Sequence, residues 1–356
     1  MRSYGLPTRA RSIRSALWTA AASVLWCAGT VGAQEPGARA AEREAFAWPW
    51  EINFHAISKA MVERDYQVTQ VRRIIDRSQP DRLGEWITLR ECLTHAAEAG
   101  PHSKAFQLEY LGTEGKQLAA DELARRTREF DRIAGFLYHF QGFRVFDADL
   151  AERNYELAFA GVGQRLDRSV YVVTVTPRHN DRSRWLLELD VRTGYPLYRG
   201  EYDEADRLMA EVEVTEFAAS VPDDLEPFRE RYGVERHPDA GTAAKAIGLD
   251  SASVPGTDLL PPGFEMGSSR VLTDPLSGDR RAVVIYSDGV EQLFLRLEPS
   301  PSWTIGEGHT FAKQRGPTGE VQGSFVHKGV GYLMVGREET TVREALLKLY
   351  AQVASD

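Results

Sequence analysis

The side chains that could do acid–base or metal chemistry are scattered along this chain without the spacing that such chemistry needs. The chain has eight histidines and two cysteines. No two histidines form a His-Glu-x-x-His motif, the cysteines are not paired at zinc-ligand spacing, and no aspartate-rich calcium loop occurs. The sequence therefore predicts neither a metal site nor a cofactor.

Motifs for nucleophilic catalysis and for nucleotide binding are missing in the same way. The chain has no Gly-x-Ser-x-Gly elbow and no Ser-x-x-Lys motif. Leu111–Gln117 lacks the spacing of a phosphate-binding loop, and Gly161–Arg165 lacks the third glycine of a dinucleotide fingerprint. The adjacent carboxylates Asp223–Asp224 and Glu338–Glu339 are typical of a solvated surface. The sequence favours a binding protein over an enzyme, although residues distant in sequence could still assemble a catalytic site.

Aromatic residues are the side chains that most suggest a binding site. The run Phe136–Phe146 is rich in them, and if it begins as a strand, Phe136, Tyr138 and Phe140 point to one side. They either fill a core beneath a neighbouring helix or line an apolar pocket for an acyl chain or a peptide. These three residues and Trp185 are the candidate ligand-pocket residues.

Residues 1–33 have the composition of a secretory signal peptide. Arginines precede an apolar run from Ala16 to Ala33, which ends in the small residues of a cleavage signal. We expect cleavage after Ala33 and export to the periplasm, followed by a flexible N-terminus over residues 34–50. An uncleaved membrane anchor and a lipoprotein processed at Cys27 are the alternatives.

The charge and the cysteine content limit the partners and the covalent chemistry. The formal net charge of the chain is −9, and removal of the signal arginines would make it more acidic. This charge argues against binding to nucleic acid and against adhesion to an anionic lipid surface. Cleavage would leave Cys92 as the sole cysteine, so no intramolecular disulfide is expected even in an oxidising compartment.

Alternating apolar and polar residues predict a first domain over residues 51–217 that is mostly antiparallel β-sheet. A short helix over Ile52–Met61 precedes the strands, and a helix over Ala120–Phe136 either packs on the sheet or forms a lid over a cavity. The strands are predicted over Tyr66–Asp76, Glu85–Cys92, Lys104–Leu111, Arg153–Val162, Ser169–Pro177, Ser183–Asp203 (two runs about a turn) and Arg207–Phe217.

Residues 218–258 are rich in Pro, Gly, Ala, Ser and charge, which predicts a linker. A smaller β-sheet domain follows over residues 259–356 and ends in a helix, with a capping box at Thr341 and Glu344. Its strands are predicted over Phe264–Leu272, Arg281–Tyr286, Gln292–Leu297, His309–Arg315, Glu320–His327 and Gly331–Val335. The predicted fold class is α+β, mostly antiparallel β.

The stretch Ala282–Pro299 is apolar on both sides of Ser287–Gly289. Asp-Gly between two β-prone runs predicts a hairpin turn, because glycine accepts a positive φ at little cost. We expect this hairpin to form mainly the core of a small sheet, with one face near Phe294 and Arg296 offered to a partner. Tyr286, Phe294 and Arg296 are the candidate partner-binding residues.

Several motifs in this chain resemble the MucB/RseB family. Leu260–Phe264 resembles the Leu-Pro-x-Gly-Phe motif at the start of the family's second domain, and Tyr286–Gly289 resembles its Tyr-Ser-Asp-Gly hairpin. Val335–Thr341 matches part of the approach to its final helix. The stretch Arg165–Phe217, with a Trp-Leu-x-Leu-Asp strand and a Thr-Gly-Tyr-Pro-Leu turn, is similar to the family's first domain. Between Ala47 and Gly115 the chain departs from the family's usual strand pattern.

This resemblance implies a fold and a function. The first domain would be a LolA-like half-open β-barrel plugged by helices, and the smaller domain would be the main contact for a partner. The protein would be a periplasmic negative regulator of an envelope-stress sigma factor. It would bind the periplasmic part of a membrane anti-sigma factor and shield it from proteolysis, and lipid or lipopolysaccharide would release it. A periplasmic lipid or lipoprotein carrier is the alternative. The sequence leaves open whether the protein forms a homo-oligomer.

Overall fold

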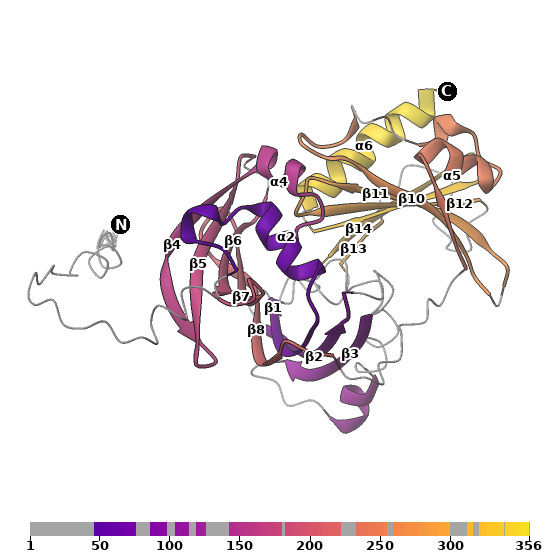
Figure 1. Ribbon diagram of the computed structural model, residues 1–356. Helices are drawn as coiled ribbons and strands as arrows, with labels where there is room; N and C mark the ends of the chain where they lie inside the picture. The colour runs from indigo at the N-terminus through magenta and orange to yellow at the C-terminus, as the bar shows by residue number, and fades with distance from the viewer. Residues whose placement is uncertain are drawn as a thin grey trace, which may run out of the picture. The chain divides into compact units, whose positions relative to one another are not determined.

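Figure 1 shows the computed structural model of the chain. The structure describes residues 46–75, 86–97, 104–113, 119–125, 142–179, 182–221, 233–254, 256, 259–275, 277–299, 312–315, 320–337 and 339–355. Residues from Ala45 to Asp356 form one compact unit. The predicted signal peptide and most of the predicted flexible N-terminus lie outside the described residues.

Eight antiparallel strands form the first sheet, in the spatial order β3-β2-β1-β8-β7-β6-β5-β4. The alternating sequence pattern produces them because successive side chains of a strand point to opposite faces. Among the described strands, β3 and β4 form the two edges of this open sheet. The strands are β1 (Tyr66–Ile75), β2 (Trp86–His95), β3 (Lys104–Thr113), β4 (Tyr155–Arg165), β5 (Arg168–Pro177), β6 (Arg184–Asp190), β7 (Pro196–Tyr202) and β8 (Leu208–Ala218).

Two short helices cover one face of this sheet. The side chain of Asn53 caps helix α2 (Phe54–Val62) by accepting a hydrogen bond from Ala56 N, and Asp147 caps helix α4 (Ala148–Asn154) in the same way. Phe54 and Ile57 of α2 are buried in one apolar cluster with Val173 of β5 and with Trp185 and Leu187 of β6. The predicted helix over Ile52–Met61 is confirmed. Of the predicted helix over Ala120–Phe136, residues 120–125 are helical, and the rest lies outside the described residues.

Seven antiparallel strands form the second sheet, in the order β13-β14-β15-β12-β11-β10-β9. Helices α5 (Ala240–Ala246) and α6 (Glu339–Ser355) bury apolar side chains in the same cluster as residues of its central strands. The strands are β9 (Gly233–His237), β10 (Glu265–Thr273), β11 (Arg280–Ser287), β12 (Gln292–Pro299), β13 (Ala312–Arg315), β14 (Val321–His327) and β15 (Val330–Gly336).

The segment 218–258, predicted as a linker, differs from that prediction in its second half. β9 pairs with β10, and α5 buries Ala240, Ala243 and Ala244 in the core of the second sheet. Alanine is the best helix former and packs closely, so a stretch rich in small residues belongs to the core here. Helix α6 begins at Glu339, so Thr341 lies buried within its first turn instead of capping it.

The predicted fold class is confirmed. The chain is α+β and mostly antiparallel β, with an open sheet covered by helices, followed by a second sheet with a C-terminal helix. The strand predictions agree with the structure because most strands bury one face and expose the other. Apolar and polar residues therefore alternate along their sequences.

Candidate functional site: a buried polar junction

The turn of the β11–β12 hairpin is buried against the first sheet. Strands β11 and β12 pair antiparallel up to Ser287 and Gln292, as predicted. Asp288 in the turn is fully buried, and Val290 lies in the apolar cluster that holds Trp185 and Leu187 of the first sheet. The strands of the hairpin are therefore part of the second sheet, whereas its turn is buried in the core of the first sheet.

Gly289 allows the turn to approach helix α4 closely. Its φ is +102°, and a Cβ atom there would lie 2.2 Å from the backbone nitrogen of Ala151 and 2.6 Å from its Cα. Phe146 N–H donates a hydrogen bond to Gly289 O at 2.8 Å. Both the left-handed conformation and the lack of space require glycine at this position.

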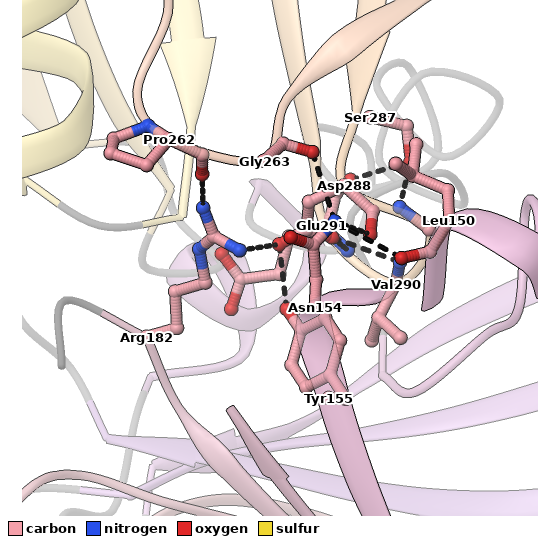
Figure 2. A network of polar contacts seen from close by, with 11 residues as sticks. Leu150, Asn154, Tyr155, Arg182, Pro262, Gly263, Ser287, Asp288, Val290 and Glu291 are labelled. Atoms are coloured by element: carbon pink, nitrogen blue, oxygen red, sulfur yellow. Dashed lines mark hydrogen bonds and ion pairs between the residues drawn. The ribbon is translucent and has the colours of Figure 1, made fainter. Parts of the chain in front are cut away.

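The carboxylate of Asp288 is surrounded by hydrogen-bond donors (Figure 2). The Tyr155 hydroxyl donates to Oδ2 at 2.7 Å, and Arg182 Nη1 lies 2.9 Å from the same oxygen. The backbone N–H groups of Val290 and Glu291 donate to Oδ1 at 2.9 and 2.7 Å. Because each carboxylate oxygen already has two partners, Asp288 is suited to fixing structure rather than to accepting a proton from a substrate.

Asn154, the last residue of α4, connects three carbonyl groups. Its side-chain Nδ2 donates to Leu150 O at 3.0 Å within the helix. The same nitrogen also lies 3.0 Å from Gly263 O and 2.9 Å from Asp288 O (Figure 2), so its two hydrogens are shared among three carbonyl oxygens. A Cβ atom on Gly263 would lie 2.1 Å from Asn154 Oδ1, so this approach again depends on glycine.

Arg182 completes the group from the β5–β6 connection. Its side chain is fully buried, pairs with Asp288 and donates to the carbonyl oxygen of Pro262 (Figure 2). Its guanidinium carbon also lies 5.0 Å from the ring centre of Phe264, a cation–π distance. We call Asn154, Tyr155, Arg182, Asp288 and Gly289 the junction.

Electrostatics favour a neutral tyrosine in the junction. Burial raises the pKa of Tyr155 well above its ordinary value, with a further contribution from the charges of Glu291 and Asp288, so its hydroxyl keeps the proton that it donates. Burial also raises the pKa of Asp288, and this rise is opposed by Arg182, by the Tyr155 hydroxyl and by the two backbone N–H groups. Removing one partner of such a buried pair leaves an uncompensated charge, which typically costs about 3–5 kcal/mol.

A second group of polar contacts joins the two sheets beside the junction. Glu201 of β7 is buried, accepts a hydrogen bond from the Ser183 hydroxyl at 2.8 Å, and pairs with Arg337, which follows β15. The guanidinium of Arg337 lies 4.9 Å from the ring centre of Trp185. Further out, Arg153 and Glu265 form an exposed ion pair at 2.9 Å.

A pocket of about 350 Å³ lies at the other end of the first sheet. Three aromatic rings form its wall: the Tyr66 and Tyr195 rings are 4.6 Å apart, and the Tyr195 and Phe217 rings are 5.4 Å apart. Charged side chains of Arg64 and Asp65 contribute to its lining. This pocket, part aromatic and part charged, has room for a small ligand or for part of a larger one.

Of the four predicted ligand-pocket residues, the structure describes Trp185, which does not line this pocket. Trp185 is buried in the first core, where its ring meets Phe143 edge-on at 5.8 Å. Phe136, Tyr138 and Phe140 lie outside the described residues. A pocket formed by these four residues therefore stays a prediction.

The predicted partner-binding residues divide between the two faces of the second sheet. Tyr286 is buried on the face covered by α5 and α6. Phe294 is buried in a small cluster with Val283 and Val335, and alternation along the strand places Arg296 on the same face. Arg296 is partly exposed and pairs with Glu298. The part of the hairpin prediction that assigned it to a sheet core therefore agrees with the structure.

Sequence reasoning missed the junction. Asn154 ends helix α4, Tyr155 begins β4, and Arg182 lies in the β5–β6 connection. Their partners across the junction lie in Leu260–Phe264 and Tyr286–Gly289, two of the motifs that carry the family resemblance. The usable signal is Asp-Gly flanked by apolar residues, because it predicts the turn although not what the turn contacts. No group of three or more His, Cys, Asp or Glu side chains in the described ranges could hold a metal ion. Within those ranges, no helix is long and apolar enough to cross a bilayer.

This chain matches no family model, but it is similar to a curated protein. The sigma factor AlgU regulatory protein MucB of Pseudomonas aeruginosa is 28% identical over 183 residues, covering 49% of this chain and 53% of that protein. The chain thus matches about half the length of this curated relative. The predicted resemblance to the MucB/RseB family is confirmed over this part.

Solved structures of MucB also align with the chain. A crystal structure of MucB is 20% identical, covers 82% of this chain and 94% of that chain, and has a TM-score of 0.46. The complex structure of Pseudomonas aeruginosa MucA/MucB is 20% identical, covers 81% of this chain and 94% of that chain, and has a TM-score of 0.45.

Proposed function

We propose that this protein is a periplasmic regulator that holds the periplasmic part of a membrane anti-sigma factor. The single observation that carries the proposal is the curated relative, whose name is that of a sigma factor regulatory protein. In this proposal the bound segment is shielded from proteases, so the sigma factor stays inactive until the complex is released. Residues 1–33 would act as the signal peptide, and residues 259–356 would supply the main contact with the partner.

The junction supports a binding role through its rigidity. The buried Arg182–Asp288 ion pair and the charge-assisted hydrogen bond from Tyr155 to the Asp288 carboxylate join the second sheet to the first. Asn154 adds a neutral hydrogen bond to the carbonyl oxygen of Asp288. A fixed arrangement of two sheets presents a preorganised surface, and preorganisation lowers the entropic cost of holding a partner. We propose that the face of Phe294 and Arg296 contributes to this surface.

Release by lipid or lipopolysaccharide belongs to the same proposal. The pocket between Tyr66, Tyr195 and Phe217 offers aromatic walls beside the charged side chains of Arg64 and Asp65. This mixed lining suits an amphiphile, which has an apolar chain and a polar headgroup. The same pocket supports the second candidate function, a periplasmic carrier of lipid or lipoprotein. A carrier would retain lipid after purification without needing a protein partner.

A pull-down separates these functions. Tagged residues 34–356 are purified, incubated with solubilised envelope extract and analysed by mass spectrometry for bound proteins and extractable lipids. The regulator proposal expects a single-span membrane protein with a cytoplasmic sigma-binding domain. Lipid with no protein partner would support the carrier, and recovery of neither would contradict both.

A further inference from the structure

Strand β4 is an open edge of the first sheet with an uncharged centre. It pairs with β5 alone among the described strands, and Figure 1 shows the two side by side at the limit of the sheet. No charged residue occurs between Glu156 and Arg165. Phe159 is 43% exposed and Val162 is 67% exposed, which is unusual for apolar side chains beside an unpaired backbone edge. Such edges are templates for pairing with another strand.

A bulge gives this edge a particular symmetry. The register against β5 shifts between Phe159 and Gly161, so Ala160 is the extra residue. Before the bulge, Leu157 and Phe159 oppose Val175 and Val173; after it, Val162 opposes Tyr171. Residues that oppose one another share a face of the sheet. Phe159 and Val162 therefore lie on the same face, although three positions separate them.

The side chains of β4 are arranged symmetrically about the point between Ala160 and Gly161. The order of faces along the strand is the same in both directions from that point. From Glu156 to Arg165, apart from Ala160 and Gly161 at the bulge, reversal exchanges residues of the same face. The exchanged pairs are Glu156 with Arg165, Leu157 with Gln164, Ala158 with Gly163, and Phe159 with Val162. A two-fold axis requires this kind of self-complementary surface.

Charge also matches under this reversal. Glu156 of one copy would lie opposite Arg165 of the other, on one face of the joined sheet. Arg165 is held by Glu188 at 2.6 Å and by Glu213 at 2.5 Å. Glu213 is exposed, so Arg165 can exchange it for an incoming carboxylate while it keeps Glu188. Opposite charges at facing positions of an antiparallel pair are favourable.

We propose that β4 is a homodimer interface at which a second copy of this chain adds antiparallel. Glu156 faces Arg165 and Phe159 faces Val162 across the two-fold axis, and the two eight-stranded sheets become one. The contact is a single strand pair, so the interface is small, and we expect a reversible dimer that forms at about micromolar and higher concentrations.

Cysteine pairs test the register directly. In residues 34–356 with Cys92→Ser, we compare Leu157→Cys alone, Gln164→Cys alone, and an equal mixture of the two proteins. Positions 157 and 164 are about 23 Å apart along one strand, but they face each other in the proposed dimer. The proposal expects disulfide-linked dimers in the mixture and little cross-linking in either variant alone. Equal cross-linking in all three samples, or none in any, would overturn it.

Analytical ultracentrifugation tests the surface without cysteines. Val162→Lys brings a charge close to the two-fold axis at a largely exposed position, and we expect it to weaken dimerisation about tenfold or more. Leu347→Lys on α6 is the control, since Leu347 is 42% exposed on another element. A dimer of unchanged strength in Val162→Lys, or a wild type that is monomeric at high concentration, would contradict the proposal. Circular dichroism establishes that each variant is folded.

Discussion

Asn154 Nδ2 lies 2.9 Å from the carbonyl oxygen of Asp288, although 134 positions separate the two residues. The next residue, Tyr155, binds the carboxylate of the same aspartate at 2.7 Å. The start of β4 therefore holds the hairpin turn at two points. The side chain of Asn154 therefore contacts both the motif that ends at Phe264 and the motif that ends at Gly289.

Asn154→Ala should lower the free energy of unfolding by about 2–3 kcal/mol, because it leaves buried carbonyl groups without a donor. Urea denaturation followed by tryptophan fluorescence measures the change. Lys348→Ala, at an exposed position of α6, is the control and should change stability by less than about 0.5 kcal/mol. Equal effects of the two substitutions would mean that the Asn154 contacts contribute nothing to stability.

Gly289→Ala should be much more damaging than an alanine at another left-handed glycine. Gly278 has a φ of +75°, and a Cβ atom there would meet nothing within 4 Å. Gly278→Ala should therefore cost about 1–2 kcal/mol from backbone strain alone. Gly289→Ala adds a clash with the backbone of Ala151, so its thermal midpoint should fall well below that of the control. Similar midpoints would show that the turn can withdraw from α4 at little cost.

Acid stability should depend on Asp190. Burial raises the pKa of this carboxyl, but hydrogen bonds from Arg168 and Thr193 outweigh burial and lower the pKa below its ordinary value of 3.8. The stability that ionised Asp190 contributes is therefore present above pH 3.8 and is lost as the pH falls through the lowered pKa.

Asp190→Asn should be about 1–3 kcal/mol less stable than wild type at pH 7 and should lose less stability on acidification. Chemical denaturation at a series of pH values from neutral to strongly acidic measures both effects. The control is Asp206→Asn, because Asp206 is exposed and pairs with Arg184 at the surface. An unchanged pH dependence in Asp190→Asn would show that this carboxyl does not contribute to the loss of stability in acid.

The hairpin face can be tested with two variants of different burial. Phe294→Asp places a charge at a buried position and should destabilise the second sheet by about 3–5 kcal/mol. Arg296→Ala should leave the fold intact and weaken capture of the partner in the pull-down. Leu347→Asp, at an exposed position of α6, is the control for both. Normal stability and normal capture in both variants would show that this face is neither core nor interface.

Much of the fold can be predicted because strands and helices leave local patterns. The alternation in Ser169–Pro177 and the Asp-Gly turn at 288–289 identify a strand and a hairpin from a few residues. The junction cannot be predicted in this way. Asn154 and Arg182 show no periodicity of their own, and their partners are brought to them only by the packing of whole sheets. The prediction of a linker over the alanines of α5 was wrong for a related reason. Alanine occurs both in linkers and in tightly packed cores, so its presence in the sequence does not distinguish the two.

Protection from proteolysis tests the central proposal most directly. The periplasmic domain of the captured membrane protein is digested with a fixed amount of protease, alone and with residues 34–356 present at ten times the dissociation constant. The regulator account predicts that its half-life lengthens about tenfold, since only the unbound fraction is cleaved. An unchanged half-life, together with lipid extracted from the purified protein, would contradict the regulator and favour the carrier.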